Sequence, residues 1–211
     1  MRTDDLIGLL AHDPAPRWRF RPVFAIATVL GVAVAALLFF ASIGIRRDFL
    51  AALATVRFPF KLALMLGFAA AATRLALAAG IPGERLRRRG WALAAVPVLL
   101  GCAVLAEMIA LPSDAWMTRL IGHNSRVCLA LIPLLALGPL ALFLLALRQG
   151  APTRPGLAGA VAGLAASAIG AAFYAPHCPD DSPLFVATWY SLAVLAVTAA
   201  GALVGRKLLR W

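Results

Sequence analysis

Six long runs of apolar residues constrain this chain more than any other feature of its sequence. Each run has about 20 residues, the length of helix that crosses a hydrocarbon core of roughly 30 Å. Inside a bilayer, backbone N–H and C=O groups must be satisfied within the protein, so a spanning run of this length predicts a helix. The predicted fold class is therefore all-α, a polytopic membrane helix bundle with six transmembrane helices. The spans fall at about 23–45, 58–79, 91–111, 127–147, 157–175 and 184–204.

The composition agrees with a membrane protein. Of 211 residues, 63% are apolar and 14% are charged, whereas a soluble domain carries about 25% charged residues. The net charge of +11 would suit nucleic acid, but the basic residues stand mostly at the ends of the apolar runs, where they set membrane topology. We therefore predict no direct nucleic-acid partner. The first run begins after residues 1–21 and lacks a cleavage site followed by a mature domain, so no removable signal peptide is predicted.

The distribution of Lys and Arg predicts the orientation, because cytoplasmic loops are enriched in these residues. With the N-terminus inside, the cytoplasmic set is Arg2, Arg17, Arg19, Arg21, Arg85, Arg87, Arg88, Arg89, Arg148, Arg154, Arg206, Lys207 and Arg210. The smaller, outer set is Arg46, Arg47, Arg57, Lys61, Arg119 and Arg126. We predict that both termini are cytoplasmic (N-in/C-in), with lipid around the bundle.

The spans carry little ionisable chemistry at bilayer depth. Lys61 lies near the outer end of the second span and Arg74 near its inner end, within snorkelling range of the surface. Glu107 lies one turn from the outer end of the third span, where pairing with Lys61 or Arg126 and solvation by headgroups are both open. Transporters and pumps usually place such groups at the midplane, so this placement counts against ion transport.

Small residues recur at helical spacing in the fifth span. Residues four apart lie on one face of a helix and let another backbone approach closely. We interpret this stripe as a packing device without a functional role. It comprises Gly156, Gly159, Gly163, Ser167 and Gly170.

Two cysteines are expected at the same, outer, surface of the membrane. Cys128 begins the fourth span and Cys178 lies in the loop between the fifth and sixth, whereas Cys102 is expected to be a packing residue in the third span. A disulfide persists in an oxidising periplasm and would stabilise the fold by roughly 4 kcal/mol. The alternative is a redox or thiophilic-metal switch. Spacing alone favours the structural disulfide, and the switch stays open.

Other polar residues of the outer loops are candidates to assist the cysteines. His123, His177, Asp180 and Asp181 are expected near them, and a Cys/His/Asp set is able to bind a soft metal. Cys128, Cys178 and His177 are the candidate ligands, although no pair has the short spacing of a CxxC or HExxH site. We predict no cofactor and no catalytic residue, and we do not expect an enzyme.

Residues 1–21 form a separate arm before the membrane domain of residues 22–211. Thr3 is able to cap a short helix, acidic residues suit the positive end of its dipole, and Pro14 ends it. An apolar stripe on so short a helix needs a surface to fold against. Its acidic character favours docking to a partner protein over lying on a membrane. The docking residues are Asp4, Asp5, Leu6, Ile7, Leu9, Leu10 and Asp13.

These segments together resemble the NrsF-like family of bacterial membrane anti-sigma factors. The resemblance covers essentially the whole chain and is strongest from Cys128 onward. It is carried by the arm from Thr3 to Asp13, by residues 147–155, 158–160 and 162–164, by His177-Cys178-Pro179-Asp180-Asp181-Ser182-Pro183, by Phe185-Val186-Ala187-Thr188-Trp189-Tyr190 and by residues 205–211.

The resemblance implies a function that the residues alone do not. A family member holds an extracytoplasmic-function sigma factor inactive at the inner membrane until an envelope redox or heavy-metal signal releases it. The family's paired cysteines match Cys128 and Cys178 and carry the signal, which raises the switch hypothesis above the structural disulfide. The alternative is a small membrane transporter or redox membrane protein in which these cysteines form a structural disulfide. The cognate sigma factor and the oligomeric state stay open.

Overall fold

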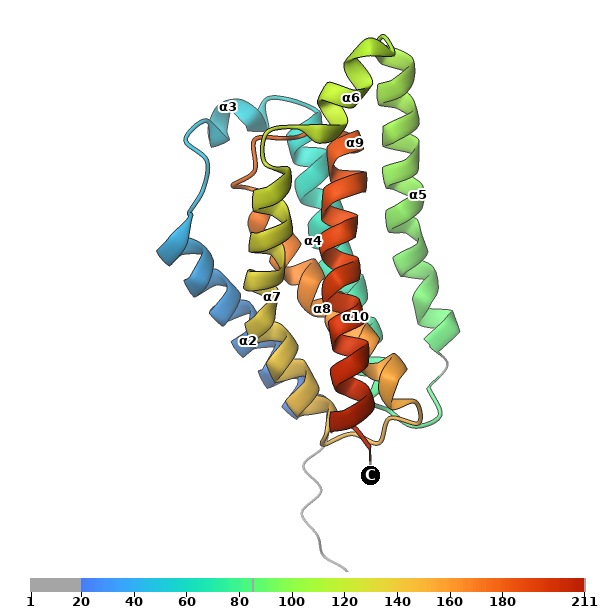
Figure 1. Cartoon of the computed structure of the whole chain (residues 1–211). Helices are drawn as coiled ribbons and strands as arrows, with labels where there is room; N and C mark the ends of the chain where they lie inside the picture. The colour runs from blue at the N-terminus through green and yellow to red at the C-terminus, as the bar shows by residue number, and fades with distance from the viewer. Residues whose placement is uncertain (1–19, 85, 211) are drawn as a thin grey trace, which may run out of the picture.

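The computed structural model describes residues 20–84 and 86–210, with only the backbone at 87–89. Within that range all regular secondary structure is helical, and the helices are labelled α2 to α10 with one π-helical turn, η1 (Figure 1). The predicted arm residues Asp4 to Asp13 lie outside the described residues, so their docking role stays a prediction.

Six helical segments are long and apolar enough to cross a membrane. The all-α fold class with six such helices is thus confirmed, whereas the N-in/C-in orientation stays a prediction. Five of the segments contain α2 (Phe20–Ser42), α4 (Arg57–Ala79), α5 (Leu86–Ala110), α7 (Ser125–Leu147) and α8 (Pro155–Tyr174). The sixth combines α9 (Pro183–Phe185), η1 (Val186–Tyr190) and α10 (Ser191–Leu208).

The helix bounds differ from the predicted spans where local geometry outweighs hydropathy. The first helix ends at Ser42 instead of residue 45, because Gly44 takes φ 62°, which is outside helical geometry. The third begins at Leu86, so Arg87 to Arg89 continue the helix into its polar end. Two short helices in the connections, α3 (Phe49–Leu53) and α6 (Asp114–Ile121), were not predicted.

The helix α8 lies at the centre of the bundle and packs against α10, α7 and α4. The small-residue stripe is confirmed as a packing device where α8 meets α10. A Cβ added to Gly159 would lie 2.2 Å from the Gly201 carbonyl oxygen, and one added to Gly163 would lie 2.5 Å from the Val197 carbonyl oxygen. We call the contact of Gly159 and Gly163 with residues 197–205 the glycine seam. Its backbones touch, so no larger residue fits there.

The six long helices alternate in direction, so the bundle has two distinct ends (Figure 1). At the terminal face, the ring of Phe20 packs against Gly80, which contacts Leu147 and Gly150. The opposite end, the thiol face, carries Arg46, Cys128 and Cys178. Just inside the terminal face, Phe24 of α2 stacks on Phe143 of α7 with ring centroids 5.1 Å apart. The start of α2 is therefore held by the end of α7.

The helix α5 stands at the edge of the bundle (Figure 1). Its main contact is with α4, and it touches α9 and η1 near the thiol face. Among its described residues Glu107 alone is buried. This helix therefore depends on few protein contacts for its position.

Candidate functional site

The structure brings Cys128 and Cys178 together at the thiol face. Cys128 lies in the first turn of α7, and Cys178 follows α8 in loop 175–182. Both side chains are fully buried and both are free thiols in one apolar cluster with Tyr174 and Tyr190. The two cysteines thus lie at one end of the bundle, and the prediction that this end is the outer surface of the membrane stays a prediction.

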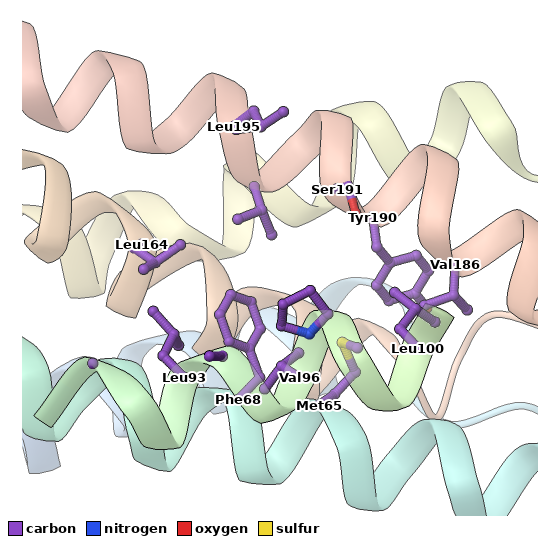
Figure 2. Close-up of a pocket in the computed structure, with 14 residues that line it drawn as sticks. Met65, Phe68, Leu93, Val96, Leu100, Leu164, Val186, Tyr190, Ser191 and Leu195 are labelled. Atoms are coloured by element: carbon purple, nitrogen blue, oxygen red, sulfur yellow. The ribbon is translucent and has the colours of Figure 1, made fainter. Parts of the chain in front are cut away.

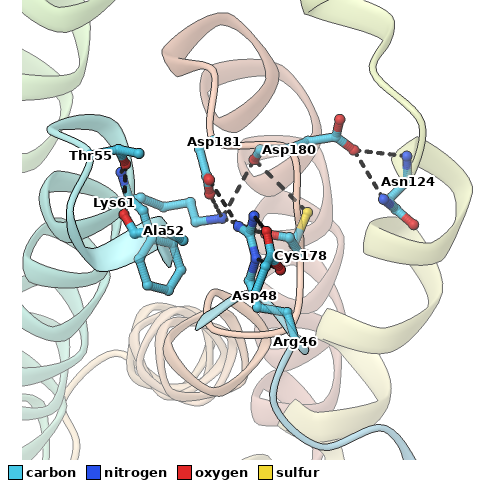
Figure 3. Close-up of polar contacts among 10 residues, drawn as sticks. Arg46, Asp48, Ala52, Thr55, Lys61, Asn124, Cys178, Asp180 and Asp181 are labelled. Atoms are coloured by element: carbon cyan, nitrogen blue, oxygen red, sulfur yellow. Dashed lines mark hydrogen bonds and ion pairs between the residues drawn. The ribbon is translucent and has the colours of Figure 1, made fainter. Parts of the chain in front are cut away.

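A buried lysine holds the backbone of Cys178 in place. The Lys61 ammonium group donates to the Cys178 carbonyl oxygen at 2.8 Å and to the Asp180 carbonyl oxygen at 3.5 Å, and it forms an ion pair with Asp181. Lys61 is 1% exposed. A cation this deeply buried is stable only with such compensation, so α4 and loop 175–182 are joined through it (Figure 3).

Arg46 forms a second basic contact with the same loop. Its guanidinium group is bidentate to Asp48 at 2.7 and 2.6 Å and reaches Asp181 at 2.9 Å. The guanidinium group lowers the pKa of the exposed Asp48 carboxyl group to about 2. Asp181 thus lies between two cations, Arg46 and Lys61, which links the segment after α2 to α4 (Figure 3).

Asp180 ties the loop to the start of α7, where Cys128 lies. Its carboxylate accepts from the backbone N–H groups of His123 and Asn124, at 3.1 and 2.9 Å, and from the Asn124 side-chain amide at 3.2 Å. A carboxylate at a helix N-terminus also interacts favourably with the helix dipole. The two cysteines are thus positioned by consecutive parts of one hydrogen-bonded network.

Glu107 extends this network to α5. Its carboxylate accepts from the Ser182 hydroxyl at 2.6 Å and from the Leu184 backbone N–H at 3.2 Å, and it pairs with Arg57 at 3.3 Å. The predicted partners Lys61 and Arg126 were wrong, as was headgroup solvation, because Glu107 is 5% exposed. Its hydrogen-bond donors come from residues 182–184, which are about 75 residues away in the sequence, so the residues around Glu107 do not reveal them.

The surroundings make the two thiols unequal. The neighbouring Cys128 thiol, as a hydrogen-bond partner, and the Lys61 charge lower the pKa of Cys178 from 9.0 to about 7, against the opposing effect of burial. The Cys178 thiol also lies 3.9 Å from the Asp180 carbonyl oxygen. Since the thiolate is the nucleophile and the metal ligand, these surroundings favour the reactive form of Cys178.

Two buried tyrosines form the apolar side of the thiol site. The rings of Tyr174 and Tyr190 lie 5.8 Å apart, and the Tyr190 ring also meets Phe185. Both hydroxyl groups lie near the thiols but make no hydrogen bond of normal geometry within the described residues. A buried polar group without a hydrogen bond lowers the stability of the fold. A rearrangement of the thiol site that gave these two hydroxyl groups partners would therefore be favourable.

The two histidines of this face contact groups other than the thiols. The Nδ1 atom of His177 lies 3.0 Å from the Gly44 carbonyl oxygen, and its ring faces Tyr174. The His123 side chain is 93% exposed, with its Nδ1 atom 3.6 Å from Asp180. In the part of the chain that the structure describes, no three His, Cys, Asp or Glu side chains gather into a metal-binding group. The thiol pair itself is the available soft donor set.

The sequence analysis named Cys128, Cys178, Asp180 and Asp181, and the structure places all four around one loop. It did not assign to the site the charged, amide and hydroxyl side chains that complete it. The signal for Lys61 was present, because a lysine at the end of an apolar span and an acidic pair in a loop at the same surface are complementary. The missed residues are Arg46, Asp48, Lys61, Glu107, Asn124, Tyr174, Ser182 and Tyr190.

Fold and site together define an all-helical protein with six helices long and apolar enough to cross a membrane and a buried pair of thiols at one end. A family model described as negative regulator of sigma F, NrsF, matches residues 10–211. The chain belongs to this family.

Two curated relatives match over their full length. The "Anti-sigma-F factor NrsF" of Caulobacter vibrioides (strain NA1000 / CB15N) is 41% identical, and the alignment covers 100% of both chains. The "Probable anti-sigma-F factor NrsF" of Azospira oryzae (strain ATCC BAA-33 / DSM 13638 / PS) is 34% identical, again over 100% of both chains. No solved structure matches the chain.

Proposed function

We propose that this chain is a membrane-bound anti-sigma factor that holds an extracytoplasmic-function sigma factor through its N-terminal arm. An envelope redox or heavy-metal signal acts on Cys128 and Cys178 and releases the sigma factor. The family and the names of the two relatives support an anti-sigma function. The observation that carries the signalling part is the burial of two unequal thiols in a network that contacts the ends of four helical segments.

The chemistry of the signal follows from two adjacent thiols. With a peroxide as oxidant, the Cys178 thiolate attacks the O–O bond and becomes a sulfenic acid, and the Cys128 sulfur then displaces water to form a disulfide. Two thiols and one hydrogen peroxide give one disulfide and two waters. A soft divalent cation instead replaces the two thiol protons and is held by both sulfur atoms. Either event changes the spacing of Cys128 and Cys178.

The helix α7 connects this event to the arm. Cys128 lies in its first turn, while Phe143 and Leu147 near its other end contact the start of α2. The last two residues of the arm, Phe20 and Arg21, are the first residues of α2. A shift of α7 along or around its axis therefore changes the position from which the arm extends. We propose the cytoplasm for both termini, so that the arm meets the sigma factor there.

Cysteine substitutions test the signal. Cys128→Ser and Cys178→Ser should each abolish most of the induction of a sigma-dependent reporter by cadmium or peroxide, and Cys102→Ser, on the exposed face of α5, should respond normally. Normal induction in both Cys128→Ser and Cys178→Ser would remove the switch from the proposal.

Deletion of residues 1–19, which leaves α2 intact from Phe20 onward, tests the docking function. The truncated chain should no longer co-purify with a co-expressed candidate sigma factor, and the double change Leu6→Asp and Leu9→Asp should weaken binding within the intact chain. Undiminished binding after the deletion would contradict docking through the arm. Reporter fusions at both ends, active only in the cytoplasm, check the orientation and the inner-membrane location.

A further inference from the structure

An apolar cavity of about 570 Å³ lies between α4, α5, α8 and the last span (Figure 2). Its wall is built by residues such as Phe68, Leu93, Leu164 and Val194, and its polar contribution is confined to Tyr190 and Ser191 at one end. The volume lies in the range of small-molecule sites. The wall offers a ligand almost nothing but carbon, so the occupant must have a long apolar part.

The extent of the cavity matches one leaflet of a bilayer. Along α5 its lining runs from Gly90 to Leu100, which is about 15 Å at 1.5 Å per residue. This is half of a hydrocarbon core of roughly 30 Å. Because the lining residues belong to helices of spanning length, a molecule reaches the cavity through the hydrocarbon. The acyl chain of a bilayer lipid fits this depth and this chemistry.

The sequence at the terminal-face end of the cavity indicates which class of lipid binds there. Gly90 directly follows Arg87, Arg88 and Arg89 at the terminal-face end of α5. Clusters of arginine at the end of a membrane helix attract anionic headgroups. We propose that the cavity binds an acyl chain of an anionic phospholipid from the leaflet at the terminal face, with its headgroup beyond Gly90 at the start of α5, where the sequence has three consecutive arginines.

A lipid in this place would complete a part of the bundle that has few protein contacts. It would fill the space between α5 and α10, while Glu107 anchors α5 at the thiol face. At the end nearer the thiol face, the cavity is lined by Met65, Val186 and Tyr190, which belong to the same apolar cluster as the two cysteines. The lipid would thus support one wall of the thiol site. This inference stands independently of any sigma factor.

A pair of neighbouring substitutions on α5 tests the proposal. Ala94 lines the cavity, whereas Ala95 is exposed and does not. The full-length chain, purified in detergent, is incubated with phosphatidylglycerol or phosphatidylcholine of identical acyl chains, and bound lipid is counted by native mass spectrometry. Ala94→Trp should weaken phosphatidylglycerol binding at least about tenfold by overfilling the cavity, and Ala95→Trp should bind like the native chain.

Equal lipid retention by Ala94→Trp and Ala95→Trp would overturn the site. Equal retention of the two lipids by the native chain, or unchanged preference after replacing Arg87 and Arg88 by Gln, would overturn the headgroup assignment. Leu195→Trp fills the cavity from the opposite wall, with exposed Leu192→Trp as its control, so the result does not depend on the folding of one variant. No sigma factor is present, and a failure here leaves the proposed function untouched.

Discussion

The two ends of this bundle are stabilised by different physical means. Toward the terminal face, α8 and α10 meet through the glycine seam, where backbones touch and the surrounding side chains are apolar. At the thiol face, the helix ends are joined through loop 175–182 by buried charges and hydrogen bonds to Lys61, Arg46, Glu107 and Asn124.

The glycine seam therefore tolerates little change in structure, whereas the network at the thiol face is able to respond to its chemical surroundings. Close packing has one good arrangement, and small displacements lose many contacts at once. A network of charges and thiols responds to protons, oxidants and metal ions. Under the proposed function, a change at the thiol face would therefore move the packed helices as units.

The largest effect is expected from Lys61→Met, which keeps the length of the side chain and removes the charge. The Cys178 carbonyl oxygen then loses its closest donor, and Asp181 loses one of its two cations. Breaking a buried ion pair costs about 3–5 kcal/mol of stability. Thermal unfolding in detergent, followed by tryptophan fluorescence, measures this loss.

Arg47→Met is the matched control, because Arg47 is an exposed basic residue beside Arg46. Its unfolding should stay within about 0.5 kcal/mol of the native chain. If both variants unfold at the same temperature, the buried charge network is not what stabilises the thiol face.

A smaller effect, with opposite signs at two positions, is expected for glycine to alanine changes. Gly163→Ala places a Cβ 2.5 Å from the Val197 carbonyl oxygen, and such overpacking costs about 1–3 kcal/mol. Gly67 of α4 has open space around it, so Gly67→Ala should stabilise the helix by about 0.5–1 kcal/mol. Equal behaviour of the two variants in thermal unfolding would show that the glycine seam is not tightly packed.

Ser182→Ala tests the connection between α5 and the thiol face. It removes a 2.6 Å hydrogen bond to the buried Glu107 carboxylate, which keeps the Leu184 N–H and Arg57 as partners. The loss should be about 1.5 kcal/mol, as for a single hydrogen bond to a charged group. Ser113→Ala, at an exposed serine without a side-chain cap hydrogen bond, should change the unfolding temperature far less; an equal loss in both would place the effect outside the Glu107 contact.

The sequence predicts one of these two regions much better than the other. The spans and the small-residue stripe are properties of consecutive residues, since hydropathy and a spacing of four are read within one helix. The thiol face is built from contacts between distant segments, such as Arg46 with Asp181, 135 residues apart. No local pattern encodes such a pairing.

Two features show where predictions made from neighbouring residues in the sequence failed. For Glu107, pairing with Lys61 or Arg126 and solvation by headgroups were both left open. Instead, Ser182 and Leu184, at the turn into α9, are its hydrogen-bond donors. The last span was predicted as one uninterrupted helix, yet it contains the π-helical turn η1 beside the thiols. Such turns occur often at functional sites, and tertiary contacts determine where they form.

The smallest effect in the series is a pH dependence that should be confined to the thiol face. Because the folded-state pKa of Cys178 is lowered from 9.0 to about 7, the stability that its thiolate contributes is fully present above pH 9 and is lost as the pH falls through 7. The stability difference between the native chain and Cys178→Ala, measured by thermal unfolding with reductant and chelator present, should grow by about 1 kcal/mol from pH 6.5 to 8. Two controls are Cys102→Ala, at an exposed thiol of α5, and Gly163→Ala, in the glycine seam. For each of them the stability difference from the native chain should not depend on pH in this interval. A flat profile for Cys178→Ala would mean that Cys178 keeps its proton in the folded protein, and the two ends of the bundle would then differ in packing but not in their response to protons.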